Sequence, residues 1–178
     1  MDEQNKKHLY LIGFMGTGKT TVSRILKKKL GWPEVDADEK IAAEAGMPVS
    51  EIFERYGEPY FRDLESEMIE KIAGMKPAVV SCGGGAVMRA RNVEVMKKSG
   101  TVVLLTASAE TVYERVRNSH SRPILNGHMD VGYIRQMMEK RQSAYEEAAE
   151  VTVSTDGKKP GEVADEIIRR ALEHAGST

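Results

Sequence analysis

Residues 13–20 read GFMGTGKT and match the pattern G-x-x-x-x-G-K-[ST]. The apolar residues 9–12 come directly before this stretch and predict a buried strand, and helical periodicity follows Thr20. A glycine-rich turn in that setting directs backbone N–H groups and the positive end of a helix dipole at a phosphate. The pattern therefore predicts a nucleoside triphosphate site, with Lys19 at the β- and γ-phosphates and the Thr20 hydroxyl at Mg²⁺.

A turn that merely joins a strand to a helix is the simpler explanation of these glycines. It does not account for a lysine and a threonine placed immediately after the last glycine. We therefore expect ATP to bind at the second half of the turn and the start of the helix, which comprise Gly16, Thr17, Gly18, Lys19, Thr20 and Thr21.

The composition is that of an ordinary globular chain. Its 178 residues suit a single domain, with 40% hydrophobic and 30% charged residues. The net charge of −1 gives no reason to expect a nucleic-acid or membrane partner. Cys82 is the only cysteine, which fits a reducing compartment, and it follows an apolar run, so we expect it to be buried. The polar N-terminus lacks a signal-peptide pattern, so we expect a cytoplasmic location. No extra apolar segment demands an oligomer, so we expect a monomer.

Apolar runs and helical segments alternate along the chain, which predicts an α/β fold with a parallel sheet covered on both faces. Strands are expected at 8–12, 78–82, 101–105 and 151–153, the last near an edge, with a very short one ending at Val35. Helices are expected at 19–30, 58–73, 90–98, 109–117, 130–149 and 161–175, with Ser108 and Asp130 as N-caps and Pro160 opening the last. Ligands of such sheets bind beyond the carboxyl ends of the strands.

Two regions are less regular. Residues 36–57 are expected to hold short helices broken around residues 46–48 and at Gly57. Residues 118–128 are polar with a central Arg122-Pro123, and they form either an ordinary surface loop or a cover over a site. In the second case Arg122 stabilises negative charge on a transferring phosphoryl group.

Asp36 and Asp38 follow the short strand, with one residue between them. Paired carboxylates at this place can hold Mg²⁺ and orient an acceptor hydroxyl. A helix start is the simpler explanation of the pair alone, because acidic residues favour the first turn. The nucleotide motif changes this balance, because no aspartate follows the run 78–82, where a second metal-holding acid is often found. Asp36 is therefore our candidate for that role.

Each of the other polar groups has two possible roles. Arg62 has Glu65 three residues later, and this pair is either a surface salt bridge, which we prefer for an isolated pair, or a held guanidinium that binds a carboxylate. Arg141 is either an anion contact or an arginine whose stem covers apolar surface. The three successive glycines Gly83, Gly84 and Gly85 exceed what a tight turn needs, and we expect their N–H groups to meet a ligand.

Taken together, these motifs resemble the shikimate kinases, a family of P-loop kinases. The resemblance covers about residues 8–175. It rests on the P-loop, Asp36-x-Asp38, the segment Gly57-Glu58-x-x-Phe61-Arg62-x-x-Glu65, the triple glycine and Arg122-Pro123, with Arg141 and Tyr145 as a further match. The Phe-Arg-x-x-Glu segment followed by the triple glycine is far more selective than the P-loop.

The resemblance implies a three-layer P-loop kinase fold with a five-stranded parallel sheet, in one domain spanning 1–178. It also implies a substrate-binding region at about 36–65, a lid at about 115–128, and phosphoryl transfer from MgATP to the 3-hydroxyl of shikimate. In the roles it implies, Thr20 and Asp36 hold Mg²⁺, and Asp38 accepts the hydrogen bond of the acceptor hydroxyl. The shikimate carboxylate is implied to bind Arg62 and Arg141, with the triple glycine completing its pocket. Arg122 is implied to close over the phosphates and Arg117 to lie near adenine, where Arg115 competes for the role.

Two other functions stay open at this point. A gluconate kinase would share the P-loop and a lid and would also bind a hydroxylated acid, although the Phe-Arg-x-x-Glu and triple-glycine segments argue against it. A nucleotide-binding regulatory module without phosphotransfer would be expected to lack acceptor-site groups. Asp38, Arg62 and Arg141 are all present here.

Overall fold

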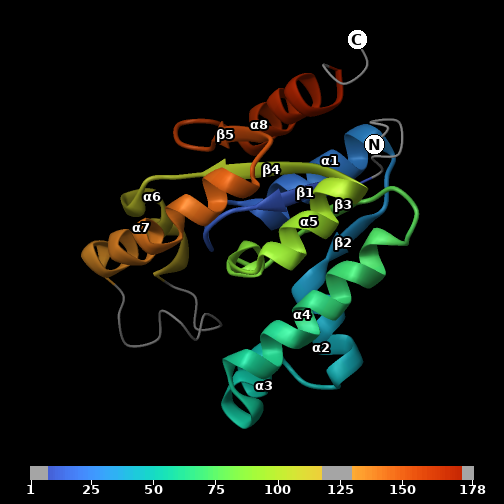
Figure 1. Ribbon diagram of the computed structural model, residues 1–178. Helices are drawn as coiled ribbons and strands as arrows, with labels where there is room; N and C mark the ends of the chain where they lie inside the picture. Colours follow the sequence, from blue (N-terminus) through green and yellow to red (C-terminus); the bar gives the residue numbers. More distant parts are fainter. Residues whose placement is uncertain (1–7, 118–129, 174–178) are drawn as a thin grey trace.

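The computed structural model describes residues 8–117 and 130–173, which form a parallel five-stranded sheet between two layers of helices (Figure 1). The strand order is β2-β3-β1-β4-β5, and all neighbouring strands are parallel. The predicted α/β fold with a five-stranded parallel sheet is therefore confirmed. The strands are β1 (His8–Ile12), β2 (Glu34–Asp36), β3 (Val79–Ser81), β4 (Gly100–Thr106) and β5 (Val151–Ser154).

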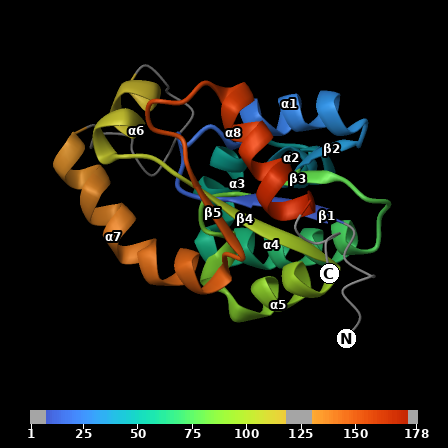
Figure 2. The same ribbon diagram turned by 90° about the horizontal axis from the view of Figure 1, so that it is seen from above.

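The helices cover both faces of the sheet. α1 and α8 pack on one face, whereas α5 and α7 lie on the opposite face (Figures 1 and 2). The helices are α1 (Lys19–Leu30), α2 (Ala37–Ala45), α3 (Val49–Tyr56), α4 (Glu58–Ala73), α5 (Ala90–Ser99), α6 (Ala109–Val116), α7 (Val131–Ala148) and α8 (Pro160–Ile167). A 3₁₀ turn, η2 (Ala86–Met88), precedes α5, and a π-helical segment, η3 (Ile168–Glu173), follows α8.

Strand β1 lies at the centre of the sheet, and its five residues are all buried. Alternate side chains enter different cores, because successive residues of a strand point to opposite faces. Leu9 and Leu11 join the core beneath α1 and α8, whereas Tyr10 and Ile12 join the larger core shared with α4, α5, α6 and α7. A continuous apolar strand is what a sheet covered on both faces requires.

The segment between β2 and β3 projects from the β2 side of the sheet as a group of three helices, α2, α3 and α4 (Figure 1). Gly46 ends α2 in the left-handed conformation with φ 71°, and α3 begins after Pro48. Gly57 separates α3 from α4. The breaks predicted around 46–48 and at Gly57 are thus confirmed.

Helix starts follow the predicted caps. The Ser108 hydroxyl accepts a hydrogen bond from the Thr111 amide at 3.1 Å, and the Asp130 carboxylate accepts one from the Tyr133 amide at 2.7 Å. Pro160 opens α8. The continuous helix predicted over 161–175 is wrong in one respect: regular α-helix ends at Ile167. There the Ile168 amide is shared between two carbonyls, and the chain continues as π-helix.

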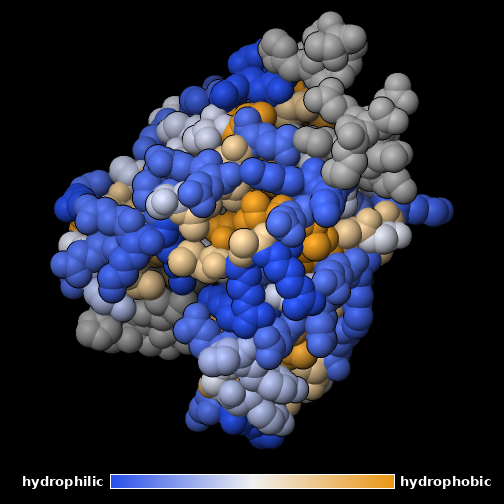
Figure 3. Space-filling model, in the orientation of Figure 1, coloured by the Kyte–Doolittle hydropathy of each residue, from blue (hydrophilic) through white to orange (hydrophobic). Residues whose placement is uncertain are grey.

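The face of the molecule shown in Figure 3 is mostly hydrophilic, with hydrophobic residues gathered in small areas. Within residues 8–117 and 130–173, no helix has both the length and the apolar character that crossing a bilayer requires.

Candidate active site

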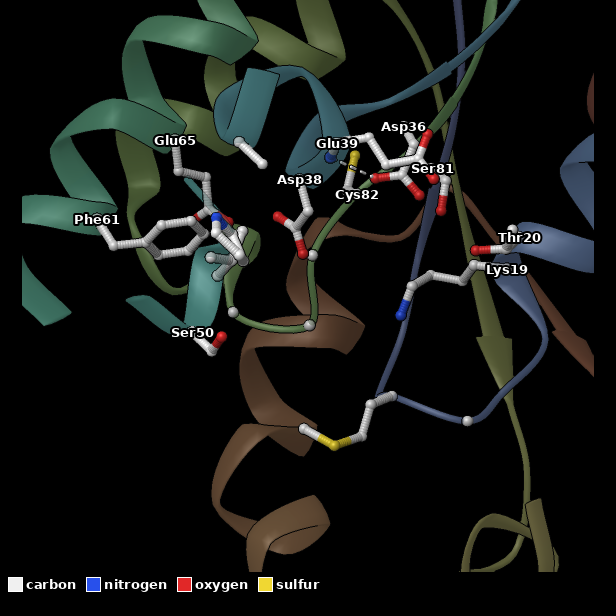
Figure 4. Close-up of a pocket in the computed structure, with 18 of the residues that line it drawn as sticks. Lys19, Thr20, Asp36, Asp38, Glu39, Ser50, Phe61, Glu65, Ser81 and Cys82 are labelled. Carbon is white, nitrogen blue, oxygen red and sulfur yellow. Dashed lines mark hydrogen bonds between the residues drawn. The ribbon is translucent and has the colours of Figure 1, made fainter. Parts of the chain in front are cut away.

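A cavity of about 800 Å³ lies at the edge of the sheet where the parallel strands end. The turn before α1, the first turn of α2, helices α3 and α4 and the loop after β3 line it, together with Arg115 and Arg141. Figure 4 shows Lys19 and Thr20 at one side, Phe61 and Glu65 at the other, and Asp38 between them. The cavity thus joins the phosphate-binding motif to the region predicted to hold a second substrate.

The glycine-rich turn takes a shape that side chains would prevent. Gly16 has φ 80°, in the left-handed region, and a Cβ atom there would lie 2.9 Å from Cγ1 of Val116. Gly18 caps α1 with φ 93°. The turn therefore passes closely under α6 and delivers the N-terminus of α1 to the cavity, as the motif predicts.

Lys19 begins α1 and reaches back over the turn. Its Nζ donates to the carbonyl oxygens of Gly13 at 2.6 Å and Phe14 at 3.2 Å. The ammonium group is thus held at the concave side of the turn, and it lines the cavity. A cation at this place suits the phosphates of a nucleotide.

Asp36, Thr20 and Ser81 bring hard oxygen ligands to the nucleotide side of the cavity. Asp36 ends β2 beside Ser81 of β3, and its Oδ1 accepts the Glu39 amide at 3.1 Å as the N-cap of α2. The helix-start explanation of this aspartate is therefore correct, and the side chain lines the cavity as well. A hydroxyl and a carboxylate suit Mg²⁺, which keeps several waters and phosphate oxygens as ligands. The residues present fit that ion.

Asp38 and Glu65 converge on Gly83. A Cβ atom at Gly83 would lie 2.9 Å from Oδ1 of Asp38 and 3.1 Å from Oε2 of Glu65. Asp38 comes from the first turn of α2 and Glu65 from the middle of α4, so the fold brings two carboxylates together across the loop after β3.

The pair of Arg62 and Glu65 is buried. Their side chains are 11% and 1% exposed, and Nη1 of Arg62 donates to Oε1 of Glu65 at 2.9 Å. The guanidinium also lies over the ring of Phe61, 5.3 Å from its centroid, and Nη2 of Arg62 contacts the exposed Glu58. These contacts contradict the surface salt bridge that we preferred from the sequence, because α4 turns this face into the cavity wall.

The Glu65 carboxyl is unusual in its ionisation. Its pKa is raised from the usual 4.5 to about 7, chiefly by burial and to a smaller extent by nearby Asp38, against the opposing effects of Arg62 and Arg141. Its Oε2 has no hydrogen-bond partner among the residues that the structure describes. Glu65 therefore changes charge near neutral pH at the wall of the cavity.

Arg141 enters the cavity from α7. Its guanidinium lies over the ring of Phe14, with Cζ 5.8 Å from the centroid, and a Cβ atom at Gly84 would lie 3.0 Å from Nη1 of Arg141. Nη1 is buried without a hydrogen-bond partner among the described residues. A buried guanidinium donor of this kind suits an anionic ligand group.

The triple glycine lies closely against side chains of the cavity. Gly83 lies against Asp38 and Glu65, Gly84 against Arg141, and Gly85 against Arg62, whose Cζ would lie 2.6 Å from a Cβ atom at Gly85. At each of the three positions, a Cβ atom would therefore displace a different polar side chain of the cavity wall.

Of the two arginines that the resemblance places near adenine, Arg115 lines the cavity and Arg117 does not. Nη1 of Arg115 donates to the Gly16 carbonyl at 2.9 Å and to the Thr155 hydroxyl at 3.3 Å, whereas Arg117 is half-exposed and pairs with Glu114. Residues that are two positions apart on a helix lie on nearly opposite faces. The face shared with Val112 and Val116 was the signal that could have selected Arg115 from the sequence.

Most of the predicted site residues meet at this cavity, with three exceptions. Thr17 is buried beneath the turn, where its hydroxyl donates to the Phe14 carbonyl at 2.8 Å, and Arg117 is absent from the lining. Arg122 and most of the predicted lid lie outside the described residues. Ser50 and Phe53, which lie within the predicted region 36–65, and Ser81 also line the cavity, although none of the three was singled out as a site residue.

Comparisons with known proteins agree with this geometry. A family model described as Shikimate kinase matches residues 15–172. A curated shikimate kinase from Thermodesulfovibrio yellowstonii is 43% identical over 163 residues, covering 92% of this chain and 94% of its own. One from Persephonella marina is 43% identical over 164 residues, with 92% and 98% covered. The solved shikimate kinase from Acinetobacter baumannii in complex with shikimate is 32% identical, with a TM-score of 0.90 and with 97% of this chain and 95% of its own covered.

Proposed function

This chain belongs to the shikimate kinase family, and we propose that its cavity is where MgATP and shikimate meet. The protein is a kinase that transfers the terminal phosphoryl group of ATP to the 3-hydroxyl of shikimate. The products are shikimate 3-phosphate and ADP, and the step belongs to the shikimate pathway of chorismate and aromatic amino acid biosynthesis.

The observation that carries the site assignment is the joining of two unlike ends in one cavity. One end holds the cation of Lys19 and the start of α1, which suit phosphates. The other end holds Arg62, Arg141 and the glycine loop, which suit a small polyol with one carboxylate. Asp38 lies between the two ends, where an acceptor hydroxyl has to be (Figure 4).

At the acceptor end, Arg62 and Arg141 bind the shikimate carboxylate, and the N–H groups of Gly83, Gly84 and Gly85 complete the pocket. The Glu65 carboxylate and the Phe61 ring hold the Arg62 guanidinium in place before the substrate arrives. A preorganised guanidinium loses less conformational entropy on binding than a free one.

At the nucleotide end, the turn of residues 16–21 and Lys19 hold the phosphates. Arg115 is better supported than Arg117 beside the nucleotide, because it already bonds the turn. Thr20 and Asp36 hold Mg²⁺, which supplies charge neutralisation at the phosphate oxygens when bound.

The chemical step needs positioning and a proton acceptor. The 3-oxygen forms a bond to the γ-phosphorus while the bond to the leaving ADP oxygen breaks, and the hydroxyl proton passes to Asp38. Lys19 stabilises the charge that spreads over the phosphoryl oxygens. Arg122 and the lid at 115–128 are proposed to close over the phosphates and exclude water. The single domain over 1–178, the monomeric state and the cytoplasmic location stay predictions.

The test is the identity of the product. We expect incubation with MgATP and shikimate to give one phosphorylated product whose ³¹P signal couples to the ring proton at carbon 3. The Lys19→Ala variant should lose this product by at least a hundredfold, while Lys28→Ala, at the far end of α1, should not. A phosphate on another hydroxyl, or an active Lys19→Ala variant, would contradict the proposed site.

A further inference from the structure

The three carbonyl groups of the glycine loop all have internal hydrogen-bond donors. The Gly83 oxygen accepts from the Ala86 amide at 3.1 Å, and the Gly85 oxygen accepts from the Met88 amide at 3.1 Å. The middle carbonyl, that of Gly84, accepts instead from a side chain: the hydroxyl of Tyr145, at 2.5 Å. Tyr145 therefore completes the set from a different part of the chain.

The amide groups of the same loop differ from its carbonyl groups in their hydrogen bonding. Among the residues that the structure describes, no group accepts a hydrogen bond from the N–H of Gly83, Gly84 or Gly85. All three glycines line the cavity. A loop whose carbonyls are internally satisfied and whose amides have no protein acceptor is suited to donate to a ligand.

Tyr145 is well placed to fix this arrangement. It lies on α7 one turn after Arg141 and is 4% exposed. Burial raises the pKa of its phenol, an effect that the Arg141 cation only partly offsets. The hydroxyl thus stays a hydrogen-bond donor throughout the neutral pH range.

The hydroxyl acts on the orientation of one peptide group. The C=O of Gly84 and the N–H of Gly85 belong to the same trans peptide, so they point in opposite directions. Holding the carbonyl toward α7 directs the Gly85 amide away from α7. Without that bond, the backbone freedom of the successive glycines would let the peptide rotate.

We propose that Tyr145 is a positioning residue for the acceptor substrate, acting through the peptide between Gly84 and Gly85. It does not touch the substrate itself. It keeps the loop amides turned toward the acceptor and, from the same helix, sets the loop against the guanidinium of Arg141. This inference rests on the proposed function, because it assumes shikimate as the ligand of the loop.

The Tyr145→Phe variant tests the inference, with Tyr10→Phe as a matched control. Tyr10 is also buried, and its hydroxyl shares a hydrogen bond of 2.6 Å with Ser99, which directly precedes β4 and so lies at the edge of the sheet opposite the glycine loop. Both variants lose one buried hydrogen bond and should lose similar thermal stability. Only Tyr145→Phe should raise the KM for shikimate, by about fivefold to tenfold, with the KM for ATP unchanged within about twofold.

Equal shikimate KM values in wild type and a folded Tyr145→Phe variant would overturn the inference while leaving the proposed function intact. Absence of shikimate-dependent ADP release in the wild type would overturn the function and this inference with it.

A second measurement uses the wild type alone and can contradict the inference even if the variant does not fold. In protein labelled with ¹⁵N-glycine, shikimate should shift the amide signals of Gly84 and Gly85. Unmoved signals at a shikimate concentration that saturates turnover would contradict the proposed role of the loop.

Discussion

The guanidinium of Arg62 donates to the carboxylate of Glu65 at 2.9 Å, from a side chain that is 11% exposed to one that is 1% exposed. An i,i+3 pair of this kind is usually a weak surface contact. Here α4 buries it in the cavity wall, where removing Glu65 would leave Arg62 with the exposed Glu58, and removing Arg62 would leave Glu65 between Asp38 and Arg141. Glu65 therefore fixes the direction of the remaining N–H donors of Arg62.

Arg62→Ala is expected to weaken shikimate binding strongly. Loss of a buried charge that pairs with a ligand carboxylate costs about 2–5 kcal/mol, which is about thirtyfold to several thousandfold in the KM for shikimate. Steady-state kinetics measure it, with Arg91→Ala as the control, because Arg91 forms an ion pair of 2.9 Å with Glu70 but is 57% exposed. An unchanged KM for shikimate would mean that Arg62 has a structural role only and does not bind the substrate.

The raised pKa of Glu65 predicts that the free energy of unfolding depends on pH. Its pKa rises from the usual 4.5 to about 7 on folding, so the folded state binds more protons between these values. The contribution of Glu65 to the free energy of unfolding is fully present below pH 4.5 and is lost as pH rises through about 7. Relative to Glu65→Gln, the wild type should lose about 2–3 kcal/mol of unfolding free energy between pH 5 and pH 8.

Urea unfolding of both proteins across this range gives the difference directly, because the titration of all other groups largely cancels. Parallel curves for the two proteins would mean that Glu65 titrates at its ordinary pKa despite its burial.

Asp38→Asn should separate catalysis from nucleotide binding. The amide cannot take the hydroxyl proton, so kcat should fall by about 10²–10⁴, while the Kd for ATP changes by less than about threefold. Asp63→Asn is the control, because Asp63 is 69% exposed and pairs with Arg89 on the outside of α4. Equal losses in kcat and ATP affinity would argue against an acceptor-side role for Asp38.

Gly85→Ala tests whether the glycine loop is tight because of its neighbours. Its φ of −104° and ψ of 6° are open to alanine, so the backbone alone does not oppose the change. The new Cβ would meet Cζ of Arg62 at 2.6 Å and force the guanidinium to move. We expect the KM for shikimate to rise at least about tenfold, on the scale of one lost charged hydrogen bond.

The matched change is Gly161→Ala in α8, where an added Cβ meets no atom within 4 Å. Wild-type kinetics in both glycine variants would show that Arg62 adapts without loss and would remove the proposed reason for Gly85.

The sequence predicted the elements with strong local signals most accurately. The bounds of β1, α1 and α4 agree with expectation, because an apolar run, a phosphate turn and the break at Gly57 define them locally. The C-terminal helix was predicted less well, since no residue in 161–175 marks the change to π-helix at Ile168.

The features of the site also differ in how well the sequence predicted them. The P-loop residues and the triple glycine were predictable because each is a contiguous motif with its own physical reason. The burial of Glu65 and the bond from Tyr145 to Gly84 were not, because each depends on elements brought together from distant parts of the chain. The presence of Arg115 in the cavity wall lies between these cases, since helical periodicity places it on the face of Val112 and Val116.

The most direct measurement is ADP release with MgATP and a panel of acceptors: shikimate, quinate, gluconate and nucleoside monophosphates. Fast release with shikimate alone is the predicted result, because the chain belongs to the shikimate kinase family and its two arginines, Asp38 and glycine loop suit a hydroxylated acid. Release with gluconate would preserve the P-loop kinase fold but contradict the acceptor-site assignments. No acceptor-dependent release from folded protein that binds ATP would contradict the account and point to a regulatory nucleotide-binding module.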